Sequence, residues 1–406
     1  MSDTAMAARR IVNACYQGFT LSDGALRMLV LLHLHAAGQG PWALVLVLLP
    51  YEIAGVFTNL LGGWLGARFG LKVSLLVGIA LQVVACALLA LDAAWLTLPL
   101  VMATQVLSSI AKDLAKTAAK SFVRQLGGDG DGGSAGLASG MFLRVAWLTG
   151  SKNAAKGLGF FVGGALLGAA GFRGTNVGLA IGLALLFGLA LWLVPAGPRK
   201  PDAKLRHVVD HGPAVRWLAM ARLFLFASRD TWFVVALPLF LAGSLGWAPS
   251  AVGGFLSVWV IGYGTVQALT PWFVQPVSAA RGVRPTWLAT ASLLLPLCAT
   301  AAALHAGLPP ATTIVVGLCA YGVLFAITSS LHSWLVLAIA HGDDVVERVG
   351  FYYAANSAGR LLGTVLSGGV FAAYGAATDG LLACLGASAL LVVAATACTF
   401  PVRRRA

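Results

Sequence analysis

Two lysines, Lys152 and Lys156, stand one helical turn apart inside the otherwise apolar segment 142–172. A helix through this segment would carry both ammonium groups on one face, at the depth of a membrane interior. Each such cation costs about 2.5 to 3.5 kcal/mol to insert at the centre of a bilayer helix. Cations at this depth therefore indicate a function, and a group of them suggests a pathway for an anion.

Other apolar stretches contain similar charges. Three arginines fall near the middle of the membrane when positions are counted inward at 1.5 Å per residue: Arg27, Arg229 and Arg360. Three carboxylates lie within the same stretches: Asp23, Glu52 and Asp230. Asp23 precedes Arg27 by one turn, so an intrahelical ion pair is expected there. Five cations against three carboxylates leave about two positive charges for a ligand.

Polar side chains beside these cations would suit an oxyanion. Thr149 shares a helical face with both lysines, and Asn356 shares one with Arg360. Guanidinium groups bind phosphate-like oxygens in bidentate fashion, and lysines add point charge. Asn153 and Asn356 could instead form helix-packing hydrogen bonds. His332 could carry a coupling proton or be a buried core histidine.

Lys112 and Lys116, followed by Lys120, form one stripe near the expected cytoplasmic end of the fourth apolar run. This stripe could be an electropositive vestibule that concentrates an anion arriving from the cytoplasm. It could equally consist of lysines that extend to the membrane edge without any function. Both interpretations stay open from the sequence.

The composition defines the class of protein, because 59% of the residues are hydrophobic and only 10% are charged. Twelve apolar runs are long enough to cross a hydrocarbon layer of about 30 Å as helices. They are 13–37, 42–66, 73–91, 95–111, 142–171, 174–195, 214–242, 250–275, 284–304, 311–340, 349–375 and 378–400. The predicted fold is an all-α integral membrane protein with twelve transmembrane helices.

Lysines and arginines outside these runs fall almost entirely on one side of the predicted membrane. The positive-inside rule therefore places both termini in the cytoplasm of a multi-pass protein of the inner (plasma) membrane. The net charge of +13 mostly reflects this topology, and nucleic acid is not an expected partner. The six cysteines are dispersed, so no metal site is expected, and no motif predicts a cofactor or a catalytic centre.

The polar stretch 196–213 divides the chain into two groups of six spans, 1–195 and 214–406. Similar sequences recur in the two groups, since Asn153 and Lys156 precede a run of glycines as Asn356 and Arg360 do. Internal similarity between corresponding helices is typical of a duplicated transporter. We therefore expect two pseudo-symmetric six-helix halves.

Two resemblances refine this prediction. The segment GWLGARFGLK at 63–72 resembles the loop signature of the major facilitator superfamily, although Ala67 stands where that signature usually has an acidic residue. Five further segments resemble the organoarsenical efflux permeases of the ArsJ type: FTLSDGALRML at 19–29, IAKDL at 110–114, TGSKN at 149–153, ASRDTWF at 227–233 and GFYY at 350–353. A Gly/Asp-rich insertion after Gln125 departs from the pattern.

The resemblance implies export of 1-arseno-3-phosphoglycerate, which glyceraldehyde-3-phosphate dehydrogenase forms when it uses arsenate, and hence a functional link to that enzyme and arsenate resistance. The expected mechanism is alternating access of the two halves about a central anion site. Uniport and proton antiport through Glu52, Asp23 or His332 both stay open as the mode of export. A facilitator of an ordinary phosphorylated metabolite is the alternative function, and a membrane-embedded enzyme or sensor is a more remote one.

Overall fold

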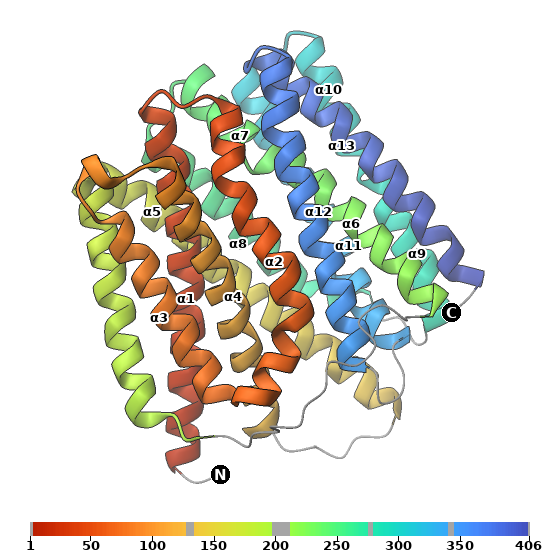
Figure 1. Cartoon of the computed structure of the whole chain (residues 1–406). Coiled ribbons are helices and arrows are strands. Elements are labelled where there is room, and N and C mark those ends of the chain that lie inside the picture. The colour runs from red at the N-terminus through yellow and green to blue at the C-terminus, as the bar shows by residue number, and fades with distance from the viewer. Residues whose placement is uncertain (1–2, 127–133, 197–211, 275–278, 340–344, 405–406) are drawn as a thin grey trace.

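The computed structural model describes residues 3–126, 134–196, 212–274, 279–339 and 345–404. Within those ranges the regular structure is helical and contains no strand. The helices pack side by side into one bundle (Figure 1). The predicted all-helical membrane fold is confirmed.

The first half of the chain forms five long helices and one short 3-10 turn. They are α1 (Asp3–Ala36), α2 (Pro41–Phe69), α3 (Leu71–Leu89), η1 (Ala93–Trp95), α4 (Leu98–Leu126) and α5 (Ser134–Leu193). The second half contains helices of more varied length, including a π-helical turn, η2. They are α6 (Pro213–Phe233), α7 (Ala236–Leu239), η2 (Phe240–Ser244), α8 (Pro249–Phe273), α9 (Ala279–Ser292), α10 (Leu294–His305), α11 (Pro310–Ile339), α12 (Val345–Ala373), α13 (Thr378–Thr399) and η3 (Phe400–Arg404).

Three features relate these elements to the twelve predicted spans. Helix α5 contains the fifth and sixth spans, which meet at a kink where Gly171 has a φ of 68°. Glycine adopts this left-handed conformation without steric cost, so the chain can reverse there. The seventh span comprises α6, α7 and η2, and the ninth comprises α9 and α10. The described helices thus accommodate twelve spans.

Eight stretches of the described residues are long and apolar enough to cross a membrane, and one of them, Gly150–Leu193, has 44 residues and holds two spans. Helices α1, α4 and α12 are not among the eight. Each carries charged side chains in its interior, such as Arg27, Lys112 and Arg360, which lower its hydropathy. These three helices therefore bring charge into the bundle.

The N-terminal end of α1 and the C-terminal end of α13 lie toward the same side of the bundle (Figure 1). This agrees with an even number of spans. Which side faces the cytoplasm stays a prediction from the distribution of basic residues.

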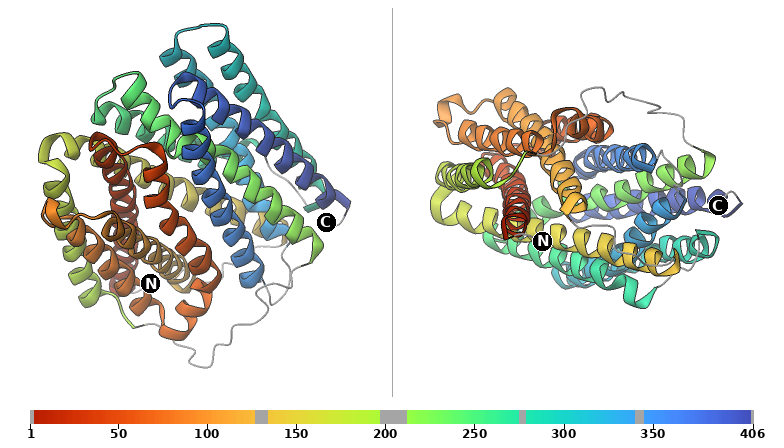
Figure 2. Two further views of the ribbon diagram at one scale, coloured as in Figure 1. Left: turned by 45° about the horizontal axis from the view of Figure 1, so that its top comes forward. Right: turned by 90° about the horizontal axis from the view of Figure 1, so that it is seen from below.

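The two halves meet along two helix pairs, α5 with α8 and α2 with α12. Figure 2, in the view from below, shows α5 in yellow running alongside α8 in green. Gly150, Gly157 and Gly164, spaced seven residues apart on α5, face α8. A methyl group at any of them would come within 2.5 to 2.8 Å of an α8 backbone oxygen. Small residues let helices approach closely in a membrane, so these glycines define the α5–α8 contact.

Corresponding glycine pairs also pack the helices within each half. Gly159 and Gly163 on α5 face the backbone of α1, and Gly359 and Gly363 on α12 face the backbone of α6. The same four-residue spacing thus serves the same contact in both halves, as expected for pseudo-symmetric halves. The predicted linker 196–213 lies almost entirely outside the described residues, so the predicted boundaries 1–195 and 214–406 stay a prediction.

The segment 63–72, which resembles the loop signature, ends in a sharp reversal of the chain between α2 and α3. Helix α2 ends at Phe69, Gly70 has a φ of 84°, and α3 begins at Leu71. The Lys72 ammonium then donates a hydrogen bond of 2.9 Å to the carbonyl of Leu191, which ties this turn to the end of α5. The side chains of 62–67, including Ala67, lie outside the described part.

Apolar side chains from both halves pack into one buried cluster near the α1–α2 connection. Leu31, Leu44 and Leu48, from the end of α1 and the start of α2, belong to the same buried cluster as Leu239 and Leu241 of the second half. This cluster therefore joins the two halves through buried apolar side chains on the side of the α1–α2 connection.

We predict that Gly157→Ala lowers the stability of the folded protein, because the added methyl group would lie 2.8 Å from the Ser257 carbonyl oxygen. Overpacking of this kind costs about 1 to 3 kcal/mol. Gly182→Ala on the same helix is the matched control, since nothing lies within 4 Å of the position that its methyl group would take. Thermal unfolding in detergent measures both, and equal melting temperatures for the two variants would contradict the role of the α5–α8 contact.

Candidate substrate cavity

A cavity of about 200 Å³ lies at the centre of the bundle, between the two halves. Helices α1, α2, α4 and α5 line it from the first half, and α6, α8, α11 and α12 line it from the second. Sites for drug-sized ligands measure about 300 to 1,000 Å³, so this cavity suits a smaller molecule.

Eight basic side chains line the cavity: Arg27, Lys112, Lys116, Lys152, Lys156, Arg222, Arg229 and Arg360. Three carboxylates line it as well: Asp23, Asp113 and Asp230. A fourth carboxylate, Glu52, is buried and accepts hydrogen bonds from two of the arginines. Among the described residues, eight cations against four carboxylates leave an excess of four positive charges. All five cations predicted from the sequence are brought together here.

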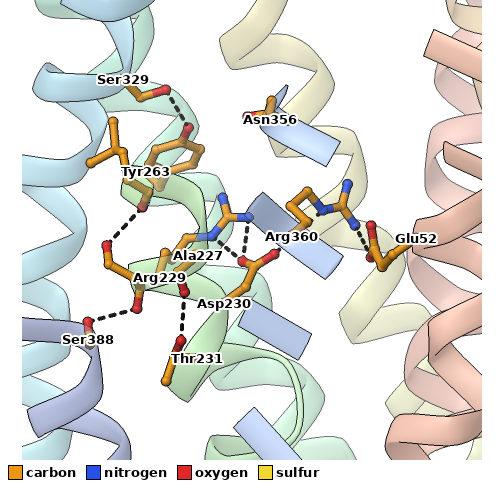
Figure 3. A network of polar contacts seen from close by, with 12 residues as sticks. Glu52, Ala227, Arg229, Asp230, Thr231, Tyr263, Ser329, Asn356, Arg360 and Ser388 are labelled. Atoms are coloured by element: carbon orange, nitrogen blue, oxygen red, sulfur yellow. Dashed lines mark hydrogen bonds and ion pairs between the residues drawn. The ribbon is translucent and has the colours of Figure 1, made fainter. Parts of the chain in front are cut away.

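A chain of ion pairs crosses from one half to the other at the centre of the cavity. One oxygen of Glu52 accepts hydrogen bonds from Arg27 at 2.8 Å and from Arg360 at 2.7 Å. The other side of Arg360 lies 3.5 Å from Asp230, which also accepts a 2.6 Å bond from Arg229. Figure 3 shows Arg360 between the two carboxylates. Arg360 of α12 thereby links α2 of the first half to α6 of the second.

Arg229 is held by aromatic rings as well as by Asp230. Its guanidinium carbon lies 4.8 Å from the centre of the Phe226 ring and 5.3 Å from that of Phe325. Cation–π contacts are strongest where water is excluded. The wall contributed by the second half therefore combines arginines with aromatic faces.

Asp23 forms a different pair from the one that the sequence predicted. It lies 3.4 Å from the Lys156 ammonium on α5 and accepts a 2.5 Å hydrogen bond from the Tyr51 hydroxyl. Arg27, its expected partner one turn later, points instead to Glu52. The predicted ion pair between Asp23 and Arg27 was wrong, because each residue pairs with a side chain of a neighbouring helix instead.

Lys112 and Lys116, which the sequence predicted at a cytoplasmic vestibule or at the membrane edge, line the central cavity. The Lys112 ammonium lies 4.2 Å from the centre of the Tyr51 ring, and Lys116 pairs with Asp113 at 2.7 Å. The Asn59 side chain accepts a bond from Lys116 and donates one of 2.9 Å to Ser357 of the second half. This cluster is therefore a second polar link between the halves.

Arg222 is a cavity residue that the sequence reasoning missed. It is only 4% exposed, donates to the Asn356 side chain at 3.2 Å, and bonds to Ser329 through two acceptors. A signal was available, because Arg222 lies inside the seventh apolar run and precedes Arg229 by seven residues, or two helical turns on one face.

The remaining predicted site residues divide between the cavity and its surroundings. Asn356 and Asn153 both line the cavity, and Asn153 donates a 2.7 Å bond to Gln267 of α8. His332 does not line it; its Nε2 atom lies 3.2 Å from the Thr290 hydroxyl, so it packs between α11 and α9. The structure therefore favours a core histidine over a coupling group. Thr149 and Lys120 have side chains outside the described part.

Comparisons with known proteins identify the fold. No protein-family model matches the chain, and no curated protein matches it. The crystal structure of a bacterial homologue of the iron transporter ferroportin, in an outward-facing state, matches with a TM-score of 0.65 and 14% identity, over 98% of this chain and 100% of that one. The human organic anion transporter MFSD10 (TETRAN) matches with a TM-score of 0.66 and 14% identity, again over 98% and 100%.

These matches extend over nearly the whole chain, and at this sequence identity they concern the fold. The chain is a multi-pass membrane protein with the major facilitator fold of twelve helices in two halves. Its centre holds a small cavity with an excess of basic side chains among the described residues.

We predict that Glu52→Gln strongly destabilises the protein, because two arginines would lose the carboxylate that lies between them. Removing one partner from a buried ion pair costs about 3 to 5 kcal/mol. Asp92→Asn is the matched control, because Asp92 forms a surface pair with Arg173 at 3.9 Å. The loss of a surface pair costs less than about 1 kcal/mol. Chemical unfolding in detergent compares the variants, and similar losses in both would refute the central role of Glu52.

Proposed function

We propose that this protein is a transporter that exports a small organic anion with several negative charges by alternating access. The observation that carries the proposal is the cavity between the halves, where eight basic side chains face four carboxylates. Basic groups in a site shielded from water attract an anion strongly. A cationic cargo would be repelled by the same groups.

The two similar structures reported above agree with transport and differ in cargo. One neighbour is described as an organic anion transporter and the other as a homologue of an iron transporter. The excess of basic groups favours the anion for this chain.

The proposed substrate is 1-arseno-3-phosphoglycerate, with arsenate resistance as the result of its export. The resemblance of five segments to ArsJ-type permeases supports this identity, and the substrate carries a carboxylate, a phosphate and an arsenate. Guanidinium groups suit such oxyanions, whereas trivalent arsenic prefers thiolates. Glyceraldehyde-3-phosphate dehydrogenase would supply the ester in the cytoplasm of the same cell, so the two proteins are linked through the substrate. The protein would lie in the inner membrane with both termini in the cytoplasm.

An ordinary phosphorylated metabolite is the alternative cargo. Phosphate and arsenate groups have the same shape and charge, so the same arginines and lysines would bind either. Measurements of transport and of competition between the two cargoes therefore distinguish them, whereas the residues of the cavity do not.

Alternating access would use the contacts between the halves. The walls of the cavity come from both halves, and each contributes basic groups that repel those of the other. An anion between the walls would neutralise this repulsion and allow the halves to close around it. Opening on the side of the α1–α2 connection would separate the apolar cluster that contains Leu31 and Leu239.

The membrane potential alone is sufficient to drive export by uniport. Each net negative charge that leaves an inside-negative cell gains about 2.3 kcal/mol per 100 mV. Proton antiport through Asp23 or Glu52 is the alternative, although each carboxylate is engaged by a cation. A potential imposed on proteoliposomes at equal pH on both sides would drive uniport.

We expect arsenate-exposed cells that lack other arsenic exporters to accumulate less arsenic when this protein is expressed together with glyceraldehyde-3-phosphate dehydrogenase. The protein alone, the dehydrogenase alone and neither protein are the controls. A decrease with the permease alone would indicate another arsenical or an endogenous dehydrogenase. Unchanged accumulation in every arm, with phosphoglycerate transported in vesicles, would favour the ordinary metabolite.

We predict that Lys156→Ala and Arg360→Ala each abolish export while the protein still reaches the membrane. Both residues contact carboxylates from the cavity wall and supply positive charge to the cavity. Neither change leaves a carboxylate without a partner, because Asp23 keeps Tyr51, Glu52 keeps Arg27 and Asp230 keeps Arg229. Arg173→Ala is the matched control, because Arg173 is exposed and lies outside the cavity. Transport in vesicles and the amount of folded protein are measured together. Normal transport by both cavity variants would exclude this site.

A further inference from the structure

Arg222 lies at a different level of the cavity from the chain of ion pairs. It precedes Arg229 by seven residues on α6, which corresponds to about 10 Å along the helix axis. Asn356, which contacts Arg222, precedes Arg360 by one turn on α12. The cavity therefore has two levels with basic groups, one at Arg222 and one at Arg229 and Arg360.

The neighbouring side chains fix the Arg222 guanidinium in one position. Nε donates to Asn356 at 3.2 Å, and Nη1 donates to the carbonyl and the hydroxyl of Ser329 at 3.1 and 3.2 Å. The guanidinium carbon lies 4.1 Å from the centre of the Phe226 ring and 5.1 Å from that of Tyr352. A side chain held in this way loses little entropy when it binds a ligand.

Arg222 differs from the other cavity arginines in its partners. Arg27, Arg229 and Arg360 each contact a carboxylate, whereas the acceptors of Arg222 among the described residues are an amide, a carbonyl and a hydroxyl. Its Nη2 atom donates to none of the described residues. A buried charge whose acceptors are all neutral is costly, and an anionic group of a ligand would offset that cost.

Neutral donors surround the same level. Gln267 of α8 donates to the Ser329 hydroxyl at 3.3 Å, and the Tyr263 hydroxyl lies 3.4 Å from it. Asn153 of α5 bonds to Gln267, and all of these side chains line the cavity. The surroundings of Arg222 therefore offer hydrogen bonds to an oxyanion from both halves.

We infer that Arg222 binds a second anionic group of the substrate, a carboxylate or a phosphate-type oxyanion, while the first group binds at the level of Arg229 and Arg360. This inference rests on the proposed function and names the class of cargo more closely. The cavity selects molecules that carry an anionic group at each end. Molecules with one anionic group bind at one level only.

Two probes of nearly equal size test the inference with the purified full-length protein in detergent. 3-Phosphoglycerate carries a phosphate and a carboxylate, whereas glycerol 3-phosphate carries the phosphate alone. Because a hydrogen bond to a charged group contributes strongly, we expect the wild type to bind 3-phosphoglycerate at least about tenfold more tightly. Arg222→Met is expected to remove this preference and to leave the affinity for glycerol 3-phosphate within about twofold.

Arg216→Met is the matched control, because Arg216 is exposed on the same helix and lies outside the cavity. It should retain the preference. Asn356→Ala removes the acceptor of Arg222 Nε and should reduce the preference for 3-phosphoglycerate. This variant replaces Arg222→Met in the test if Arg222→Met does not fold. The ratio of the two affinities in one preparation does not depend on the fraction of folded protein.

The outcomes separate the inference from the proposed function. Tight binding of both probes without a preference, or a preference that survives in Arg222→Met and Asn356→Ala, would overturn the assignment of Arg222 and leave the anion transporter intact. Failure of the wild type to bind either probe would count against the proposed organophosphate cavity itself and would overturn the inference with it.

Discussion

The burial of basic side chains at the centre of a membrane-spanning bundle is the constraint on which the rest of this structure depends. Each would be costly in hydrocarbon, so the fold provides carboxylates, aromatic rings and polar side chains around them. Glu52 is the central element, because one carboxylate oxygen contacts both Arg27 and Arg360. The carboxylates do not balance all of the basic groups among the described residues, and the remaining positive charge is the basis for the proposal that the cavity binds an anion.

Close helix packing makes this arrangement possible. Gly157 and Gly164 bring α5 against α8, while Gly359 and Gly363 bring α12 against α6, so that long basic side chains from different helices converge on one small space. The ion pairs that stabilise the centre also join the two halves, and Arg360 is shared between them. An anion that competes for Arg360 would therefore act on the proposed binding site and on the contact between the halves at once, which gives the proposed alternating access a physical basis.

Much of the fold and part of the site could be predicted from the sequence. Apolar length predicts spans and the rise of a helix predicts depth, so Lys152, Lys156 and Arg229 were placed together correctly. The pairing of Asp23 with Arg27 was wrong, because the closest cation to Asp23 comes from another helix. Arg222 was missed although it lies in a predicted span, and its contacts with Ser329 depend on a helix more than a hundred residues away.

The sequence by itself determined the class of protein, the helical spans and the depth of the five predicted cations, because hydropathy and helical rise are properties of each segment alone. The tertiary structure decided which carboxylate contacts which cation, which residues line the cavity, and that His332 packs outside it. Those outcomes depend on the rotation and separation of neighbouring helices. Rotation and separation are fixed by close contacts such as those of Gly157 and Gly363, which join segments far apart in the chain.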